Sequence, residues 1–286
     1  MPASPSLRRR RLAAELRRLR DQSGLSISDV ADRLGWAGSR ISRIETRQLG
    51  VTAPDLRKLL NLYGVEDDAY RCRLAEMARR ANDRGWWQSY PRNVVPSEYG
   101  DLITVEAEAA TIRSYQPEVV PGLLQTPGYA RAVIRAGRKS DTAAEIDRRV
   151  EVRLERQQVL TRADAPPRVH IVLNEAVLRR RVGGPQVMHD QLEYLMADRD
   201  RANVTIQVLP FDTGAHPSMV GPFTMMTFLD PGDLGVVYLE HPTSSLFLET
   251  PAELRAYEEF WDDIQGSAYS SDDSRTFLKT YSLRYG

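Results

Sequence analysis

Residues 26–45, SISDVADRLGWAGSRISRIE, form the stretch that most restricts how this chain can fold. Ser26 precedes an aspartate by three positions, which is the spacing of a capping box at a helix start, with Asp in place of Glu. Gly35 is expected to end that helix, as glycine commonly does. Ile41 and Ile44 are three positions apart and would face one side of a following helix. The stretch therefore predicts two short helices joined by a tight turn.

Helical patterns flank this pair on both sides. Leucines at helical spacing predict a first helix from Arg8 to a left-handed cap at Gly24. Thr52 is a suitable N-cap with a proline two positions later, so a fourth helix is expected there. A fifth helix is expected at roughly 67–83. Five short helices with a tight turn between the second and third are typical of a helix-turn-helix DNA-binding domain.

The net charge of zero hides an asymmetry along the chain. Residues 1–84 carry 18 Arg and Lys against 11 Asp and Glu, a net charge of +7, whereas residues 85–286 carry −7. A tryptophan pair, glycine and prolines mark a junction near Gly85. We therefore expect a basic domain at 1–84 and an acidic one at 85–286, with nucleic acid as the partner of the first.

The second part of the chain changes from helical to strand-like patterns. A helix at about 101–114 and a long charged helix at about 143–161 come first. Four short β-branched runs then read as strands: RVHIVL, VTIQVLP, FTMMTFL and GVVYLE. The run QVMHDQLEYLMADRD between the first two is helical, which predicts a strand–helix–strand unit. The expected fold class is an all-α N-terminal helix-turn-helix domain followed by a mixed α/β domain.

The third helix supplies the expected DNA contacts. In helix-turn-helix geometry it lies in the major groove, and arginine can grip guanine with two parallel hydrogen bonds, so Arg43 is the leading base reader. Phosphate contacts position a protein without reading sequence. The full set of expected DNA-binding residues is Gly38, Ser39, Arg40, Ser42, Arg43, Arg47, Arg8, Arg9, Arg10 and Arg11, of which Arg40, Arg47 and the Arg8–Arg11 cluster are expected on phosphates. The alternative is an ordinary helical bundle with a solvated arginine face.

The stretch LRRLRDQSGLSISDVADRLGWAGSRISRIE resembles regulators of the XRE/Cro type. That resemblance implies a structural pair between Arg20 and Glu45, which would anchor the third helix to the first. Two positions depart from the family pattern. Ile27 stands where a polar residue usually contacts a phosphate, and Gly38 offers no side chain where the family often reads a base.

The polar residues of the second domain do not form a recognisable catalytic or metal-binding motif. Glu175 in LNEAVL and Glu240 in YLEH are carboxylates that could lie near each other, but no nucleophile or second partner is evident. Gln125 and Tyr129 flank the turn in PGLLQTPGYA, which is either a functional surface or simple packing of its leucines. These four residues are the partner or ligand candidates. No catalytic residue, metal site or cofactor is expected, so the chain is not predicted to be an enzyme.

Several further segments resemble the C-terminal domain of WhiJ-like actinobacterial regulators, among them RRVEVRLERQ, LNEAVLRRRVGG and GPFTMMTF. The resemblance implies transcriptional control with a protein or small-molecule input, in arrangements described as antitoxin-like. The expected function is a sequence-specific transcription regulator whose C-terminal domain senses a partner or ligand. The alternative is an antitoxin-like interaction module that mainly holds a small partner protein encoded nearby.

Partners and compartment follow from composition and geometry. We expect a homodimer on an inverted-repeat operator in double-stranded DNA, since two recognition helices can then meet two half-sites. The chain has one cysteine, Cys72, and no run of eighteen apolar residues, so no disulfide and no membrane span are expected. The start lacks the apolar segment of a secretory signal. A cytoplasmic, nucleoid-associated protein is the expectation.

Overall fold

Local hydrogen bonds explain why the helix-turn-helix forms at residues 26–45. In helix α2 (Ile27–Leu34) the Ser26 side chain accepts from the Asp29 N–H, and the Asp29 carboxylate accepts from the Ser26 N–H. Gly35 then takes a left-handed φ of 66°, where a β-carbon would be strained. Helix α3 (Gly38–Glu45) begins only three positions later. The capping box and the tight turn expected from the sequence are confirmed.

The computed structural model describes residues 7–46, 48–82, 85–197, 202–229 and 235–286. These fall into two compact units, Met1–Ser89 and Tyr90–Gly286. Each unit has its own core and is described by itself.

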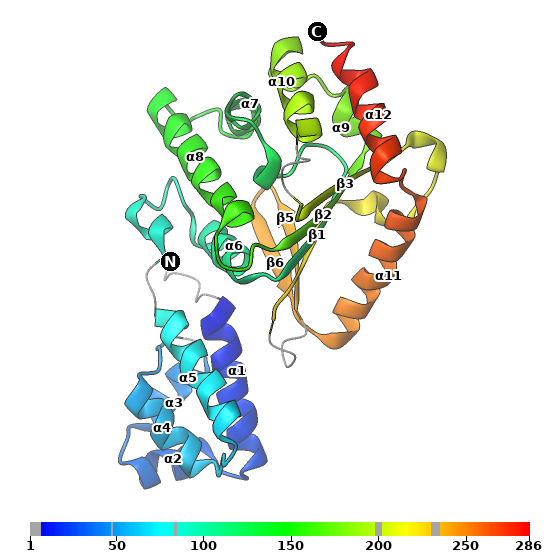
Figure 1. The fold of residues 1–286 in the computed structure, drawn as a ribbon. Coiled ribbons are helices and arrows are strands. Elements are labelled where there is room, and N and C mark those ends of the chain that lie inside the picture. The colour runs from blue at the N-terminus through cyan, green and yellow to red at the C-terminus, as the bar shows by residue number, and fades with distance from the viewer. Residues whose placement is uncertain (1–6, 47, 83–84, 198–201, 230–234) are drawn as a thin grey trace. The chain divides into compact units, whose positions relative to one another are not determined.

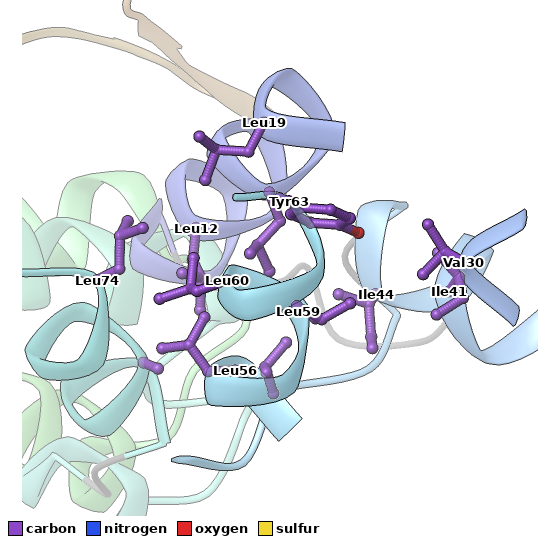
Figure 2. Packing of buried hydrophobic residues seen from close by; sticks show 13 residues of the cluster. Leu12, Leu19, Val30, Ile41, Ile44, Leu56, Leu59, Leu60, Tyr63 and Leu74 are labelled. Atoms are coloured by element: carbon purple, nitrogen blue, oxygen red, sulfur yellow. The ribbon is translucent and has the colours of Figure 1, made fainter. Parts of the chain in front are cut away.

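The described secondary structure of the first unit consists of helices. Besides α2 and α3, its α-helices are α1 (Leu7–Gln22), α4 (Ala53–Leu62) and α5 (Asp68–Asn82). One buried cluster joins them, and Figure 2 shows Leu59 of α4 beside Ile44 of α3 and Val30 of α2 beside Ile41 of α3. Its members are Leu12, Leu16, Leu19, Val30, Ile41, Ile44, Val51, Leu56, Leu59, Leu60, Tyr63, Leu74 and Ala78. Burial of the Ile41 and Ile44 side chains fixes which face of α3 points outward.

The second unit is built on a mixed sheet, whose described strands lie in the order β3-β2-β1-β4-β5-β6. The first three in that order pair in parallel, and the remaining pairs are antiparallel. The strands are β1 (Thr111–Gln116), β2 (Arg168–Asn174), β3 (Val204–Leu209), β4 (Phe223–Thr227), β5 (Val236–His241) and β6 (Ser244–Leu248). The parallel connection from β2 to β3 runs through a helix, which confirms the predicted strand–helix–strand unit.

Helices cover both faces of this sheet (Figure 1). On one face, α11 packs Trp261 and Ile264 against Tyr115, Val172 and neighbouring strand residues. On the other face lie α6 and α8. The α-helices of this unit are α6 (Ser97–Glu108), α7 (Pro127–Gly137), α8 (Ala143–Arg156), α9 (Glu175–Arg179), α10 (Pro185–Met196), α11 (Pro251–Ser267) and α12 (Ser271–Ser282). The two units together confirm the predicted fold class, an all-α domain followed by a mixed α/β domain.

One predicted element of the second unit is wrong in its extent. The expected helix at about 101–114 ends at Glu108, and residues 111–116 form the strand β1 instead. The residues of β1 alternate weakly in polarity, with Arg113, Ser114 and Gln116 beside apolar neighbours, so the sequence carries little strand signal. Tertiary pairing decides the conformation, because β1 lies between β2 and β4 and bonds to both. The sequence pattern also does not predict the edge strand β6.

None of the described helices has the length and apolar character that crossing a bilayer would require.

Candidate nucleic-acid interface

The outward face of α3 carries short and basic side chains. Ile41 and Ile44 are 1% and 3% exposed and hold the helix to the core. Ser39 and Arg43 are exposed, and Ser42 is half-buried beside them. Ala37, which precedes the helix, offers no side-chain acceptor to the first N–H groups. The face therefore combines one exposed cation, two hydroxyls and an uncapped helix start, which is a favourable place for a phosphate.

A buried ion pair fastens the end of α3 to the end of α1. Arg20 Nε donates to Glu45 Oε1 at 2.6 Å, and Arg20 Nη2 donates to Glu45 Oε2 at 3.0 Å. A third donor, Arg20 Nη1, reaches the Leu25 carbonyl at 2.9 Å. The two side chains are only 10% and 6% exposed. This two-pronged geometry resists both sliding and rotation of α3.

Tyr63, a member of the helical core, lies within the electrostatic influence of this pair. Burial raises the pKa of Tyr63 to about 12, and the charge of Glu45 adds to that rise while Arg20 opposes it. The hydrogen bonds to Glu45 are the main cause that raises the pKa of Arg20. Tyr63 is thus neutral and Arg20 is charged at neutral pH.

The Arg40 guanidinium contacts two neighbouring side chains, Asp55 and Trp36. Its Nη2 donates to Asp55 Oδ2, and its guanidinium carbon lies 4.2 Å from the centroid of the Trp36 ring. Asp55 also accepts from the Thr52 hydroxyl at the start of α4. Arg40 thereby ties α3 to α4, and its side chain is 38% exposed. A phosphate contact by Arg40 would share this guanidinium with Asp55.

The other basic candidates are only partly within the described residues. Arg9 and Arg11 are half-buried on α1. The side chains of Arg8 and Arg10 and the whole of Arg47 lie outside the described residues.

Ile27 and Gly38, the two unusual positions noted in the sequence, lie close together in the structure. Ile27 is partly buried and packs on the core of the first unit. A β-carbon at Gly38 would lie 3.9 Å from the Ile27 side chain, which is ordinary contact. The start of α2 therefore presents an apolar side chain towards the start of α3.

Comparison with known families places both halves of the chain. Residues 99–280 match a family model described as a domain of unknown function, DUF5753. The chain belongs to the DUF5753 family. Residues 11–82 of this DUF5753 protein match a model described as a helix-turn-helix domain, which supports DNA binding by its first unit. No curated protein and no solved structure matches the chain.

Gln125 and Tyr129, two of the four partner or ligand candidates, lie beside the same turn, but both are buried. Tyr129 is fully buried, and its hydroxyl accepts from the Val120 N–H at 3.1 Å. This corrects the surface interpretation of PGLLQTPGYA for Tyr129, because Leu123, Leu124 and Tyr129 pack in the core. Gln125 is 2% exposed and instead lines an internal pocket.

The two carboxylate candidates lie in different environments. Glu175 is buried, and it accepts from the Tyr281 hydroxyl at 2.8 Å and from the Phe211 N–H at 2.9 Å. These bonds, with Arg179, hold the pKa of Glu175 below its ordinary value although burial alone would raise it. Glu175 therefore joins α9 to α12 and is occupied by structural bonds. Glu240 is exposed at the end of β5 and borders the same pocket as Gln125.

Sequence reasoning missed the arginines of that pocket. Arg153 and Arg156 both line it, and they are three positions apart on one face of α8. The signal was present in RRVEVRLERQ, where charged residues fall between the apolar positions of a helix that must pack on a sheet. Among the described residues, no three His, Cys, Asp or Glu side chains gather in a way that would hold a metal ion.

Proposed function

We propose that this DUF5753 protein is a sequence-specific DNA-binding transcription regulator. The observation that carries the proposal is the division of α3 into two faces. One face is fixed by Ile41, Ile44 and the Arg20–Glu45 pair, and the other presents Arg43 and Ser39 to solvent. A rigid helix with an exposed arginine between small residues can enter a major groove about 12 Å wide. The net charge of +7 on residues 1–84 favours approach to the DNA backbone.

Arg43 is the residue that we assign to base reading. Its planar guanidinium can donate two parallel hydrogen bonds to O6 and N7 of one guanine. Gly38, Ser39 and Ser42 are small enough to let the backbone of α3 approach the base edges. Arg40, Arg47 and the Arg8–Arg11 cluster are assigned to phosphates, together with the uncapped start of α3.

An Arg43→Ala change is expected to relax sequence choice at one position of each half-site. A lost bidentate contact costs about 1–3 kcal/mol of discrimination, or roughly 5-fold to 150-fold in preference for guanine at that position. The measurement compares the affinities of both proteins for single-base variants of the preferred site. Arg79→Ala is the control, because Arg79 is 61% exposed on α5 and pairs with Glu76. An equal loss of affinity for all sequences would show that Arg43 contacts only phosphate.

We propose further that the protein binds an inverted repeat as a homodimer. A recognition helix of eight residues spans only about 12 Å, so it reads a few base pairs and a second copy is needed for a specific site. The DUF5753 domain is assigned the regulatory input, a ligand or a small partner protein encoded nearby. The internal pocket of that domain supports the ligand. Strongly exposed apolar side chains, Met219 and Val220, offer a surface to a protein.

A further inference from the structure

The pocket of the DUF5753 domain lies between helices and the sheet. It has a volume of about 280 Å³, close to the lower end of the range of roughly 300–1,000 Å³ for ligand sites. Its walls come from α6, α8 and the 119–125 segment, and its floor comes from the sheet. Large apolar residues, such as Leu102, Ile112 and Leu123, make up much of the lining.

Strand register builds the floor of the pocket. Ser114 of β1 lies opposite Ile171 of β2 on one side and Thr224 of β4 on the other. Thr224 in turn lies opposite Tyr238 of β5. Neighbours in register point to the same face, so these four residues form one row across the sheet beneath the pocket. The floor therefore offers hydroxyl groups beside apolar surface.

Arg156, one of the two pocket arginines, is neutralised within the fold. It donates from Nη2 to Glu106 Oε1 at 2.6 Å and from Nη1 to the Tyr99 hydroxyl at 3.0 Å. The Arg156 and Glu106 side chains are 10% and 3% exposed. The charges of Arg156 and Glu106 compensate each other. Arg153 is therefore the pocket arginine that is available to a ligand.

Arg153 makes no ion pair with any described residue. Its Nη1 donates to Gln125 Oε1 at 2.8 Å, and Gln125 Nε2 donates to the Val120 carbonyl at 2.7 Å. The Arg153 Nε atom is buried and has no hydrogen-bond acceptor among the described residues. Gln125 thus fixes the guanidinium, while a donor on its Nε–Nη2 edge is left without an acceptor, which is costly unless a ligand supplies one.

Gly122 keeps space open beside both guanidinium groups. A β-carbon there would lie 3.3 Å from Arg156 Nη1 and 3.6 Å from Arg153 Nε. The positive field of this corner also acts on Tyr99. Burial alone would raise the pKa of Tyr99, but Arg156 and Arg153 outweigh it and hold the pKa below its ordinary value.

We propose that this pocket binds a small organic carboxylate with an apolar body, whose two oxygens meet the Nε–Nη2 edge of Arg153. A carboxylate matches that planar edge with two parallel hydrogen bonds. The apolar walls would cover the body of the ligand, and Glu240 at the border of the pocket disfavours a doubly charged anion. Carboxylate binding by the pocket does not depend on DNA. A regulatory effect of the ligand on DNA binding, however, rests on the proposed function.

Calorimetric titration of the full chain tests the proposal with three probes, octanoate, benzoate and hydrocinnamate, and with their neutral amides. At least one carboxylate is expected to bind, and its amide is expected to bind about ten-fold more weakly or worse. Failure of all three carboxylates would overturn the proposal, and so would equal binding of acid and amide. Stronger binding of inorganic phosphate than of any carboxylate would also overturn it.

Matched variants assign the binding to Arg153. Arg153→Gln is expected to lower carboxylate affinity about ten-fold or more and to leave amide affinity unchanged. Arg148→Gln, an exposed position on the same helix, should change neither. Gly122→Ala keeps both arginines and fills the space beside them, so it should also lower the affinity for the carboxylate. This second variant keeps the test valid if Arg153→Gln impairs folding. Unchanged carboxylate affinity in Gly122→Ala and in Arg153→Gln would contradict the assignment. A protein that binds carboxylate but no DNA would overturn the proposed function alone.

Discussion

Glu106→Gln is expected to destabilise the DUF5753 domain by about 3–5 kcal/mol, the usual cost of removing one partner from a buried ion pair. The substitution keeps the shape of the side chain and removes its charge. Arg156 would then remain buried, 10% exposed, with only the Tyr99 hydroxyl and an amide as acceptors. Because arginine is not deprotonated in proteins, the guanidinium cannot escape the cost by losing a proton.

The measurement is hydrogen exchange of the strand amides of β1 and β2 in the full chain, which separates this domain from the helical one. Glu98→Gln serves as control, since Glu98 lies exposed on the same helix, α6, and should change stability by less than about 0.5 kcal/mol. A loss for Glu106→Gln that is no larger than the control would mean that the pair contributes nothing to this fold.

Glu45→Gln is expected to have an effect of similar size on the first unit, about 3–5 kcal/mol. The change removes the buried carboxylate that pairs with Arg20, whose side chain is 10% exposed. Arg20 keeps the Leu25 carbonyl as an acceptor and Asp21 as an ion-pair partner, but the Asp21 side chain is 57% exposed to solvent. A domain of this size is stable by only about 5–15 kcal/mol, so such a loss weakens the anchor of α3 substantially. DNA affinity should fall with it, although Glu45 itself would not contact DNA.

Two readouts check this second prediction. Thermal or urea unfolding gives the stability, and binding to the selected operator gives the affinity. Asp32→Asn is the control, because Asp32 is exposed on α2 and its replacement makes the surface more positive. Full stability of Glu45→Gln with weakened DNA binding would assign Glu45 to the interface rather than to the anchor.

The helical unit could be predicted closely because its signals are local. Ser26, Gly35 and Thr52 act on backbone groups within four positions, and the leucine spacing names the buried face directly. The outward face of α3 follows from the same periodicity. The ion pair of Arg40 with Asp55 could not be predicted, since it depends on how α4 returns beside α3.

The second unit was predicted less completely because distant segments decide it. Strand β1 has a polar sequence and is held by pairing with β2 and β4, more than fifty and a hundred positions away. The pocket depends on that register, for it brings Ser114 and Tyr238 under Arg153 of α8. No periodicity in the chain indicates such a meeting, and Arg153 was therefore not among the candidates.

Selection of binding sites from a random pool of double-stranded DNA tests sequence-specific binding most directly. The full chain is expected to enrich an inverted repeat whose half-sites lie about 34 Å apart, with a guanine that the Arg43→Ala protein no longer prefers. Affinity for that site should fall steeply as salt rises. If the full chain enriches no sequence and binds all DNA equally, α3 is not a reader of bases and the proposed function is wrong.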